Sequence, residues 1–328
     1  MLVIYLILLS INFLLFIFLI PVLRKLKFGQ SIRKEGPKEH YKKSGTPTMG
    51  GIGIVLGLTL NFIVLIGINK LGNNLDINSI TLKEILILIL PLFLYGVIGF
   101  IDDFLIVIKQ NNNGLSPKLK FLFQLFIGTI VYWLYLDLGF ENIINFFGLD
   151  INLSFFYGVL VVFMFVGSSN AANLTDGLDG LLGGVSLICY VFLAIFSLYL
   201  KKYLVFLYCI SMVIVLISYL FFNLPKATIF MGDVGSLAIG ASLVSVCIVL
   251  KIEVLLLVIG FVYIVETLSV ILQVWFFKKT KGNRLFKMTP LHHHFELVGF
   301  NEWEINFIFW IMEIIVCIIG GFLLWMIW

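Results

Sequence analysis

Apolar runs of about twenty residues recur along the whole chain and alternate with short polar segments. A helix needs about 20 apolar residues to cross the hydrocarbon core of a bilayer, so runs of this length are typical of membrane spans. The predicted spans lie at 2–23, 49–69, 85–108, 119–137, 153–172, 181–200, 203–222, 236–250, 254–277 and 304–327. The pattern therefore predicts an all-α integral membrane protein with ten transmembrane helices.

Composition agrees with this fold class. Hydrophobic residues make up 61% of the chain and charged residues 12%, against about 25% charged residues in soluble domains. The first run has no basic residue ahead of it and no small-residue cleavage site behind it, which favours a span over a secretory signal. The four cysteines lie inside apolar runs and are interpreted as packing residues. No loop is long enough for a separate domain, so we expect one domain over 1–328.

Lysine and arginine are distributed unevenly between the two sets of loops. The segments that follow odd-numbered spans hold 17 of the 22 basic residues. Short loops rich in Lys and Arg stay in the cytoplasm, so the bias predicts that both termini are extracytoplasmic. The polar segments 24–48, 109–120, 173–180, 223–235 and 278–303 then face the cytoplasm.

Two adjacent acids, Asp102 and Asp103, lie near the cytoplasmic end of the third predicted span. Ionisable groups near hydrocarbon usually face a cavity, a partner or a substrate, so this pair is a candidate functional site. The alternative is a helix end solvated at the interface, with Lys109 and Lys118 as structural counter-charges.

The turn at 173–180 places Asp176 and Asp179 between two spans, with glycines that permit a tight backbone. Such a turn suits a nucleotide, sugar hydroxyls or a metal, although it also suits a simple helix cap. Asn223 precedes Asp233 by ten residues, and Gly232 and Gly235 flank the carboxylate. An isolated Asp beside glycines fits Mg²⁺, which prefers one or two protein carboxylates.

Three consecutive histidines, His292, His293 and His294, precede the last span. Consecutive residues cannot share one face of a helix or strand, so a site using all three needs an irregular loop. Zinc is one candidate ligand, but no Cys or correctly spaced fourth zinc ligand lies nearby. Hydrogen bonds to phosphate or pyrophosphate explain the cluster equally well. Glu266 and Glu313 lie within spans; the first is expected to support the site and the second to be structural.

These polar segments together favour phosphoryl transfer. That chemistry needs a metal on a diphosphate, cations around developing charge, and a carboxylate that positions or deprotonates the acceptor. A lipid acceptor would explain why the chain is almost entirely membrane-embedded. The residues alone therefore predict transfer of a phosphorylated group from a cytosolic donor to a lipid phosphate.

Six segments resemble one family of membrane enzymes. They read Gly29-Gln-Ser-Ile-Arg-Lys-Glu-Gly-Pro, Lys43-Ser-Gly-Thr-Pro-Thr-Met-Gly-Gly, Gly99-Phe-Ile-Asp-Asp-Phe, Asn173-Leu-Thr-Asp-Gly-Leu-Asp-Gly, Phe230-Met-Gly-Asp-Val-Gly-Ser and Pro290-Leu-His-His-His-Phe-Glu. In this order they are similar to the phospho-N-acetylmuramoyl-pentapeptide transferases of bacterial cell-wall synthesis. The resemblance implies a multi-pass enzyme of the bacterial plasma membrane with its active site on the cytoplasmic face.

The family reaction implies UDP-N-acetylmuramoyl-pentapeptide as donor, undecaprenyl phosphate as acceptor, lipid I and UMP as products, and Mg²⁺ as cofactor. By resemblance Asp233 would bind the metal. Asp102 and Asp103 would lie at the lipid phosphate, with Asp102 as the base, and Lys118 would neutralise phosphate charge. A direct displacement and a route through an aspartyl-phosphate both fit the pattern. The family also implies a homodimer in the lipid bilayer, with no nucleic-acid partner.

The resemblance assigns five more residues to the donor. Asn173, Asp176 and Asn223 would orient the diphosphate and the surroundings of the metal. Asp179 and Phe230 would lie near the nucleoside.

The three histidines His292, His293 and His294 would line the cytoplasmic rim over the pyrophosphate, and Lys43 and Thr48 would contact substrate. One segment departs from the family pattern: a Pro-Ala pair usually precedes Phe-Met-Gly-Asp, whereas here Pro225 comes one place earlier and Lys226 takes the usual proline position. The local loop shape is therefore left open.

Two alternatives remain. A transporter would use the acids to relay protons or bind cations, but it should leave a trail of acids across the bilayer. A sister transferase that moves N-acetylglucosamine-1-phosphate would keep the aspartate motifs and differ at the histidines and at 43–51.

Overall fold

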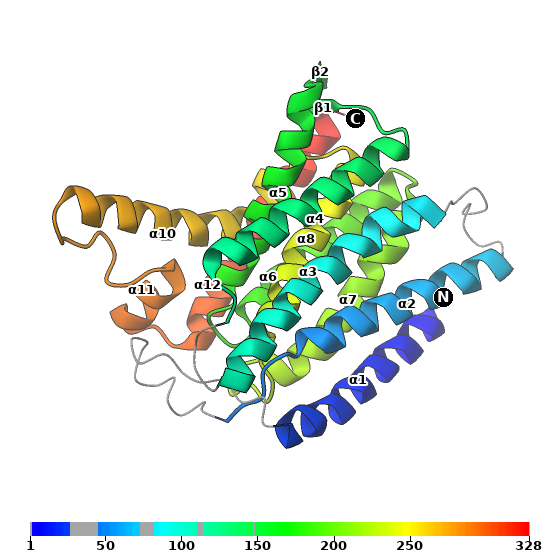
Figure 1. Ribbon diagram of the computed structural model, residues 1–328. Coiled ribbons are helices and arrows are strands. Elements are labelled where there is room, and N and C mark those ends of the chain that lie inside the picture. The colour runs from blue at the N-terminus through cyan, green and yellow to red at the C-terminus, as the bar shows by residue number, and fades with distance from the viewer. Residues whose placement is uncertain (1, 27–44, 73–81, 110–113, 147, 328) are drawn as a thin grey trace.

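The computed structural model describes residues 2–26, 45–72, 82–109, 114–146 and 148–327. Within these residues ten helices are long and apolar enough to cross a membrane, which confirms the fold class (Figure 1). They are α1 (Leu2–Lys25), α2 (Gly51–Gly72), α3 (Leu82–Lys109), α4 (Pro117–Asp137), α5 (Phe155–Thr175), α6 (Leu181–Tyr199), α7 (Tyr203–Asn223), α8 (Gly232–Leu250), α10 (Phe261–Lys279) and α12 (Glu302–Ile327). The chain is a multi-pass membrane protein.

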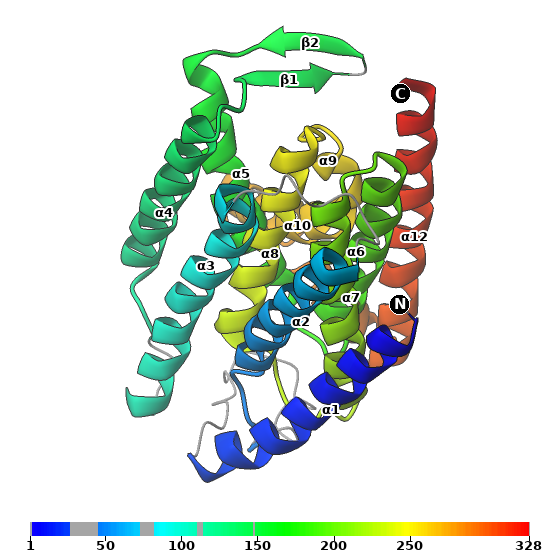
Figure 2. The same ribbon diagram turned by 90° about the vertical axis from the view of Figure 1, so that its right-hand side faces the viewer.

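A small antiparallel hairpin, which the hydrophobic pattern does not predict, joins α4 to α5. Its strands are β1 (Ile143–Phe146) and β2 (Leu149–Asn152), and their register pairs Ile143 with Asn152 and Phe146 with Leu149. Four-residue strands are too short to show a clear alternation beside long apolar runs. Figure 2 shows the hairpin lying across one end of the helix bundle.

The ninth predicted span, 254–277, is broken rather than continuous. A short helix, α9 (Leu256–Ile259), stops at Gly260, and α10 then projects sideways from the bundle (Figure 1). A Cβ on Gly260 would lie 2.8 Å from the carbonyl oxygen of Leu256, so a larger residue would crowd the break. The histidine segment also differs from expectation: it forms a helix, α11 (Leu291–Val298), and not an irregular loop.

The centre of the bundle is α8. In its apolar membrane-spanning stretch 89% is buried, against 22% in the corresponding stretches of α1 and α4. Small residues make this burial possible. A Cβ on Gly240 would lie 2.4 Å from the carbonyl oxygen of Ser168 on α5, and the Ser168 hydroxyl donates to the Gly240 carbonyl (2.9 Å). Membrane helices associate through such close backbone approach and interhelical hydrogen bonds. The middle of α8 therefore packs directly against the backbone of α5.

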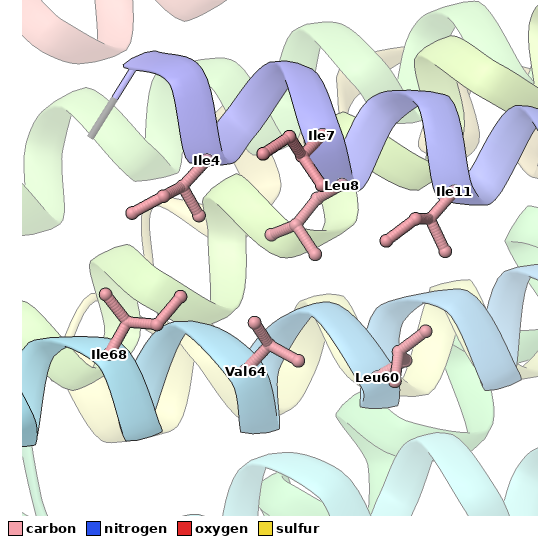
Figure 3. Close-up of a pocket in the computed structure, with 7 residues that line it drawn as sticks. All are labelled: Ile4, Ile7, Leu8, Ile11, Leu60, Val64 and Ile68. Carbon is pink, nitrogen blue, oxygen red and sulfur yellow. The ribbon is translucent and has the colours of Figure 1, made fainter.

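Helix α1 is joined to α2 by a buried polar contact, in which Asn12 Nδ2 donates to Asn61 Oδ1 (2.7 Å). Between that contact and the N-terminus the two helices leave a hollow of about 170 Å³. Its walls are entirely aliphatic (Figure 3) and comprise Ile4, Ile7, Leu8, Ile11, Leu60, Val64 and Ile68. With no polar group to hold water, the hollow suits hydrocarbon.

Candidate active site

Helices α3 and α8 cross at Gly99. A Cβ on Gly99 would lie 2.1 Å from the carbonyl oxygen of Asp233, so the absence of a side chain permits this approach. Asp103 follows Gly99 by about one helical turn, and Asp233 lies in the first turn of α8, which begins earlier than the predicted span. The crossing therefore brings the acidic pair of α3 to the start of α8.

Three carboxylates gather around one lysine at this crossing; Asp102, Asp103 and Asp233 are called the aspartate cluster below. Lys120 Nζ forms an ion pair with Asp233 and lies 3.6 Å from Asp102 Oδ2. Asn173 Nδ2 donates to Asp233 Oδ1 over 2.7 Å. Three carboxyl groups share one ammonium, so acidic groups outnumber basic groups within this set of four. The cluster is therefore suited to attract cations.

Backbone N–H groups hold the two acids of α3 in place. The Val234 N–H, at the start of α8, donates to Asp103 Oδ2 (3.2 Å). The Leu115 N–H, just before α4, donates to Asp102 Oδ1 (2.6 Å). A helix N-terminus favours negative charge, so the start of α8 stabilises both Asp103 and Asp233.

Helix α4 presents Lys120, and not Lys118, to the aspartate cluster. The buried residues of α4 include Gln124, Ile127 and Val131, and Lys120 lies one turn before Gln124 on the same face. Lys118 is two residues earlier, on another face, and is exposed. The charge-neutralising role expected of Lys118 therefore fits Lys120. Gln124, a polar residue within an apolar span, is the sequence signal that marks this inward face.

The turn at 173–180 reaches the same region from α5. Asp176 is half-buried directly after the helix. Burial, together with the negative charges of Asp233 and Asp179, raises the pKa of Asp176 to about 8. An incoming cation would favour its ionised form. Asp179 is buried, and its Oδ2 accepts a hydrogen bond from the Ala227 N–H (3.0 Å).

Asn223 joins two loops and does not point freely into the site. Its Oδ1 accepts a hydrogen bond from the Gly180 N–H (3.0 Å), and its Nδ2 donates to the Ile229 carbonyl (2.9 Å). The side chain is 4% exposed. The structure therefore gives Asn223 a scaffolding position between the 173–180 turn and the 224–230 loop. In that loop Lys226 is exposed and has a positive φ of 75°.

The segment before α2 packs against the start of α8. The Phe230 N–H donates to the Pro47 carbonyl, and the Gly50 N–H donates to the Phe230 carbonyl, each over 2.8 Å. Phe230 itself is half-buried. Thr48 is buried, and a Cβ on Gly232 would lie 2.8 Å from its hydroxyl oxygen. Thr48 therefore lies beside the aspartate cluster, whereas Lys43 falls outside the described residues.

The three histidines diverge on α11. His292 is fully buried, with its Nδ1 3.1 Å from Glu266 Oε2, which matches the supporting position expected of Glu266. Its Nε2 lies against Gly177, where a Cβ would approach within 2.1 Å. His293 Nδ1 lies 2.6 Å from a carboxylate oxygen one turn later on α11, and His294 Nδ1 accepts a hydrogen bond from the Lys287 N–H (3.1 Å). Of the three, His292 packs against the 173–180 turn.

The part of the chain that the structure describes contains no group of three or more His, Cys, Asp or Glu side chains placed to hold a metal. Mg²⁺ does not require one, because it usually binds one or two carboxylates and keeps water or phosphate oxygens as its other ligands. The carboxylate oxygens of Asp233 retain lone pairs beyond those used by Lys120 and Asn173. The donor set therefore fits Mg²⁺.

Comparisons with known proteins place the chain among transferases. Residues 85–251 match the model of the family described as glycosyl transferase family 4. The phospho-N-acetylmuramoyl-pentapeptide-transferase of Staphylococcus carnosus is 47% identical over 92% of this chain and 92% of the relative. The protein of that name from Bacillus subtilis is 45% identical over 92% of this chain and 91% of its own length. That from Oceanobacillus iheyensis is 43% identical over 93% and 91%.

Proposed function

The chain belongs to the phospho-N-acetylmuramoyl-pentapeptide transferase family, and from that premise we propose its reaction. It is a glycosyl-1-phosphate transferase. The proposed donor is UDP-N-acetylmuramoyl-pentapeptide, the acceptor is undecaprenyl phosphate, and the products are lipid I and UMP. The reaction depends on Mg²⁺.

The observation that carries this proposal is the convergence of the aspartate cluster on Lys120. Its acids come from α3 and α8, far apart in the chain, and its lysine comes from α4. Phosphoryl transfer relies on positioning and charge stabilisation more than on covalent chemistry. An acidic cluster with one lysine supports both needs: it binds a cation, and the ammonium faces phosphate oxygens.

The acceptor side is assigned to the acids of α3. Asp102 is proposed to take the proton of the lipid phosphate or to orient that phosphate, with Asp103 beside it. Lys120 neutralises phosphate charge, the role that resemblance alone would give to Lys118. Asp233 would hold Mg²⁺, which when bound neutralises the diphosphate and makes UMP a better leaving group.

The donor side is assigned to the 173–180 turn and its neighbours. Asn173 hydrogen-bonds to Asp233 and so orients it. Asp176 follows three residues later in the same turn, and burial raises its pKa to about 8. Asp179 and Phe230 are proposed to lie along the nucleoside, while Asn223 keeps the two loops together.

The rim of the site is assigned to His292, whose Nε2 faces the 173–180 turn and is proposed to contact the diphosphate. His293 and His294 are proposed to extend that rim. Thr48 is proposed to contact substrate from the segment before α2, as is Lys43.

The setting of the enzyme follows from the charge bias of the loops. We propose that the aspartate cluster faces the cytoplasm of a bacterial cell and that both termini lie outside the plasma membrane. The single domain 1–328 then opens to a water-soluble donor on one side and to a lipid acceptor in the bilayer. A homodimer is proposed on family grounds.

Two rival functions predict different products. A transporter should show acids along a path, whereas Glu313, within a span, hydrogen-bonds to the Val262 N–H (3.2 Å) and is enclosed by protein. A sister transferase would use UDP-N-acetylglucosamine. The His292–Glu266 pair beside Gly177 favours the larger muramoyl donor, because the sister enzyme is expected to differ in the histidine segment.

The deciding experiment supplies purified protein in lipid with UDP-N-acetylmuramoyl-pentapeptide, undecaprenyl phosphate and Mg²⁺. The proposal predicts UMP release together with a lipid-linked product. A matched reaction with UDP-N-acetylglucosamine should give neither. Product from that donor alone would establish the sister activity, and ion-driven solute uptake without UMP release would establish a transporter.

The metal requirement is tested in the same assay by chelation. Adding EDTA should stop UMP release, and adding back excess Mg²⁺ should restore it. Undiminished UMP release in EDTA would contradict the assignment of Asp233 as a metal ligand.

A further inference from the structure

The break between α9 and α10 leaves backbone groups that need partners within the bundle. The last carbonyls of a helix and the first N–H groups of the next have no intrahelical partner. In a membrane such groups must be satisfied by protein, since lipid offers no hydrogen bonds. Gly260, between the two helices, has no side chain that can cap α10.

Side chains from two other helices satisfy this break. Glu313, on α12, accepts a hydrogen bond from the Val262 N–H through Oε2 (3.2 Å). Cys189, on α6, lies with its Sγ 2.9 Å from the Ile259 carbonyl oxygen and 3.2 Å from Glu313 Oε1, so its single thiol proton is shared between two acceptors. Glu313 and Cys189 are both fully buried. A carboxylate at the start of α10 also matches the helix dipole.

One helical turn of α10 separates Val262, which Glu313 contacts, from Glu266, which contacts His292 at the candidate active site. Val262 and Glu266 are four residues apart and therefore lie on the same face of α10. Glu266 Oε2 lies 3.1 Å from His292 Nδ1 and 3.5 Å from the His292 backbone nitrogen. His292 Nε2 is buried, has no hydrogen-bond partner among the described residues, and lies against Gly177.

We propose that Glu313 is a positioning residue for the transferase reaction. It fixes where α10 begins and, through Glu266, holds the unpartnered Nε2 of His292 towards the 173–180 turn, where the diphosphate of the donor would lie. The inference rests on the proposed function. A residue that only packs in the core would not affect turnover of the donor, whereas the Glu313 carboxylate should.

Two substitutions at Glu313 distinguish these roles. Glu313→Gln keeps a carbonyl oxygen that can accept from the Val262 N–H, so its kcat/KM for the UDP-linked donor should stay within about twofold of wild type. Glu313→Leu removes the acceptor and lets α10 shift; misplacement by about 1 Å can cost about 100-fold, and a loss of that order is expected in kcat/KM. Met312→Leu, a nearly volume-conserving change at the preceding residue of α12, is the packing control and should behave like Glu313→Gln.

A double-mutant cycle with His292→Gln tests the route of the effect. If Glu313 acts through His292, Glu313→Leu should cost only about twofold more in the His292→Gln background, because coupled residues are not additive. Equal losses from Glu313→Leu in both backgrounds, measured on folded, monodisperse protein, would overturn the proposal. So would full activity of Glu313→Leu.

A second readout does not depend on turnover. Modification of His292 by diethyl pyrocarbonate, followed by mass spectrometry, should be slow in wild type and Glu313→Gln and faster in Glu313→Leu. His293 and His294 serve as internal references. Unchanged protection of His292 in Glu313→Leu would refute the positioning role even if the enzyme used a different donor, whereas absence of UMP release by wild type would refute only the proposed function.

Discussion

Each end of α8 carries a half-buried charged residue, but the two residues differ in how completely their charges are paired. At its first turn Asp233 belongs to an acidic group that exceeds its one lysine, and at its far end Lys251 follows the last residue of the helix. Negative charge at the start and positive charge at the end of a helix both suit its dipole. The difference lies in how much hydrogen-bonding and charge capacity remains for a ligand.

Lys251 has no hydrogen-bonding capacity left for a ligand. Its ammonium donates to Tyr135 OH and to the carbonyls of Glu141 (2.6 Å) and Ile143 (2.9 Å), and it lies 3.9 Å from Glu253 Oε1. These contacts tie the hairpin segment to the end of α8 with one cation against one acid. A buried charge alone therefore does not mark a site. A group whose charges are balanced is structural, and a group with excess charge can bind a further ion or ligand.

The largest effect is expected at the unbalanced end. Asp233→Asn keeps the size of the side chain and an oxygen that can accept from Asn173, but it removes the proposed metal-binding charge. UMP release should fall by about 1,000-fold or more while the thermal unfolding temperature stays close to wild type. Asp150→Asn, on the exposed hairpin, is the control and should keep activity within about twofold. Full activity of Asp233→Asn would eliminate this site.

Lys120 is the next most sensitive position. Lys120→Met removes the one ammonium proposed to neutralise phosphate charge at the aspartate cluster, so kcat/KM should fall by about 100-fold or more. Lys118→Met removes an exposed lysine of the same helix and should change kcat/KM by about twofold or less. A larger loss from Lys118→Met than from Lys120→Met would return the role to Lys118.

At the balanced end, substitution should affect stability and leave chemistry intact. Lys251→Met removes the ammonium that donates to the Glu141 and Ile143 carbonyls and faces Glu253, which should lower the free energy of unfolding by about 1–3 kcal/mol. The kcat of the folded fraction should not change. Lys201→Met, an exposed lysine between α6 and α7, is the matched control. Loss of kcat in folded Lys251→Met protein would mean that the hairpin end takes part in turnover.

The smallest effect is expected for Glu253→Gln, and it should depend on pH. Burial raises the pKa of Glu253 despite its hydrogen bond from Tyr157. A raised pKa in the folded state means that the neutral carboxyl contributes stability at low pH and that this contribution is lost as pH rises through the folded pKa. The unfolding temperature of wild type relative to Glu253→Gln should therefore decrease with rising pH. A difference that grows with pH would contradict this account.

The sequence was sufficient for the features that repeat along the chain or concentrate in short motifs. Twenty-residue apolar runs gave ten helices, and the acidic motifs named Asp102, Asp103 and Asp233, which the fold brings together. The sequence was not sufficient for features that depend on contacts between distant segments of the chain. Choosing Lys120 over Lys118 required knowing which face of α4 is buried.

The other differences between the predicted and the observed elements also arise from features that no apolar run reveals. The break at Gly260 depends on partners from α6 and α12 that no local pattern reveals, and the helix at 291–298 depends on packing of His292 against Glu266 and Gly177. The hydrophobic pattern does not predict the hairpin, because its strands have only four residues each.

Asp233, at the start of α8, is proposed to bind a divalent cation together with the donor diphosphate. Electron paramagnetic resonance of Mn²⁺, titrated into the protein with and without the UDP-linked donor, measures this binding directly. Mn²⁺ binding should strengthen with donor in wild type and in Asp150→Asn and should be lost in Asp233→Asn. Identical Mn²⁺ binding by wild type and Asp233→Asn would contradict this proposal.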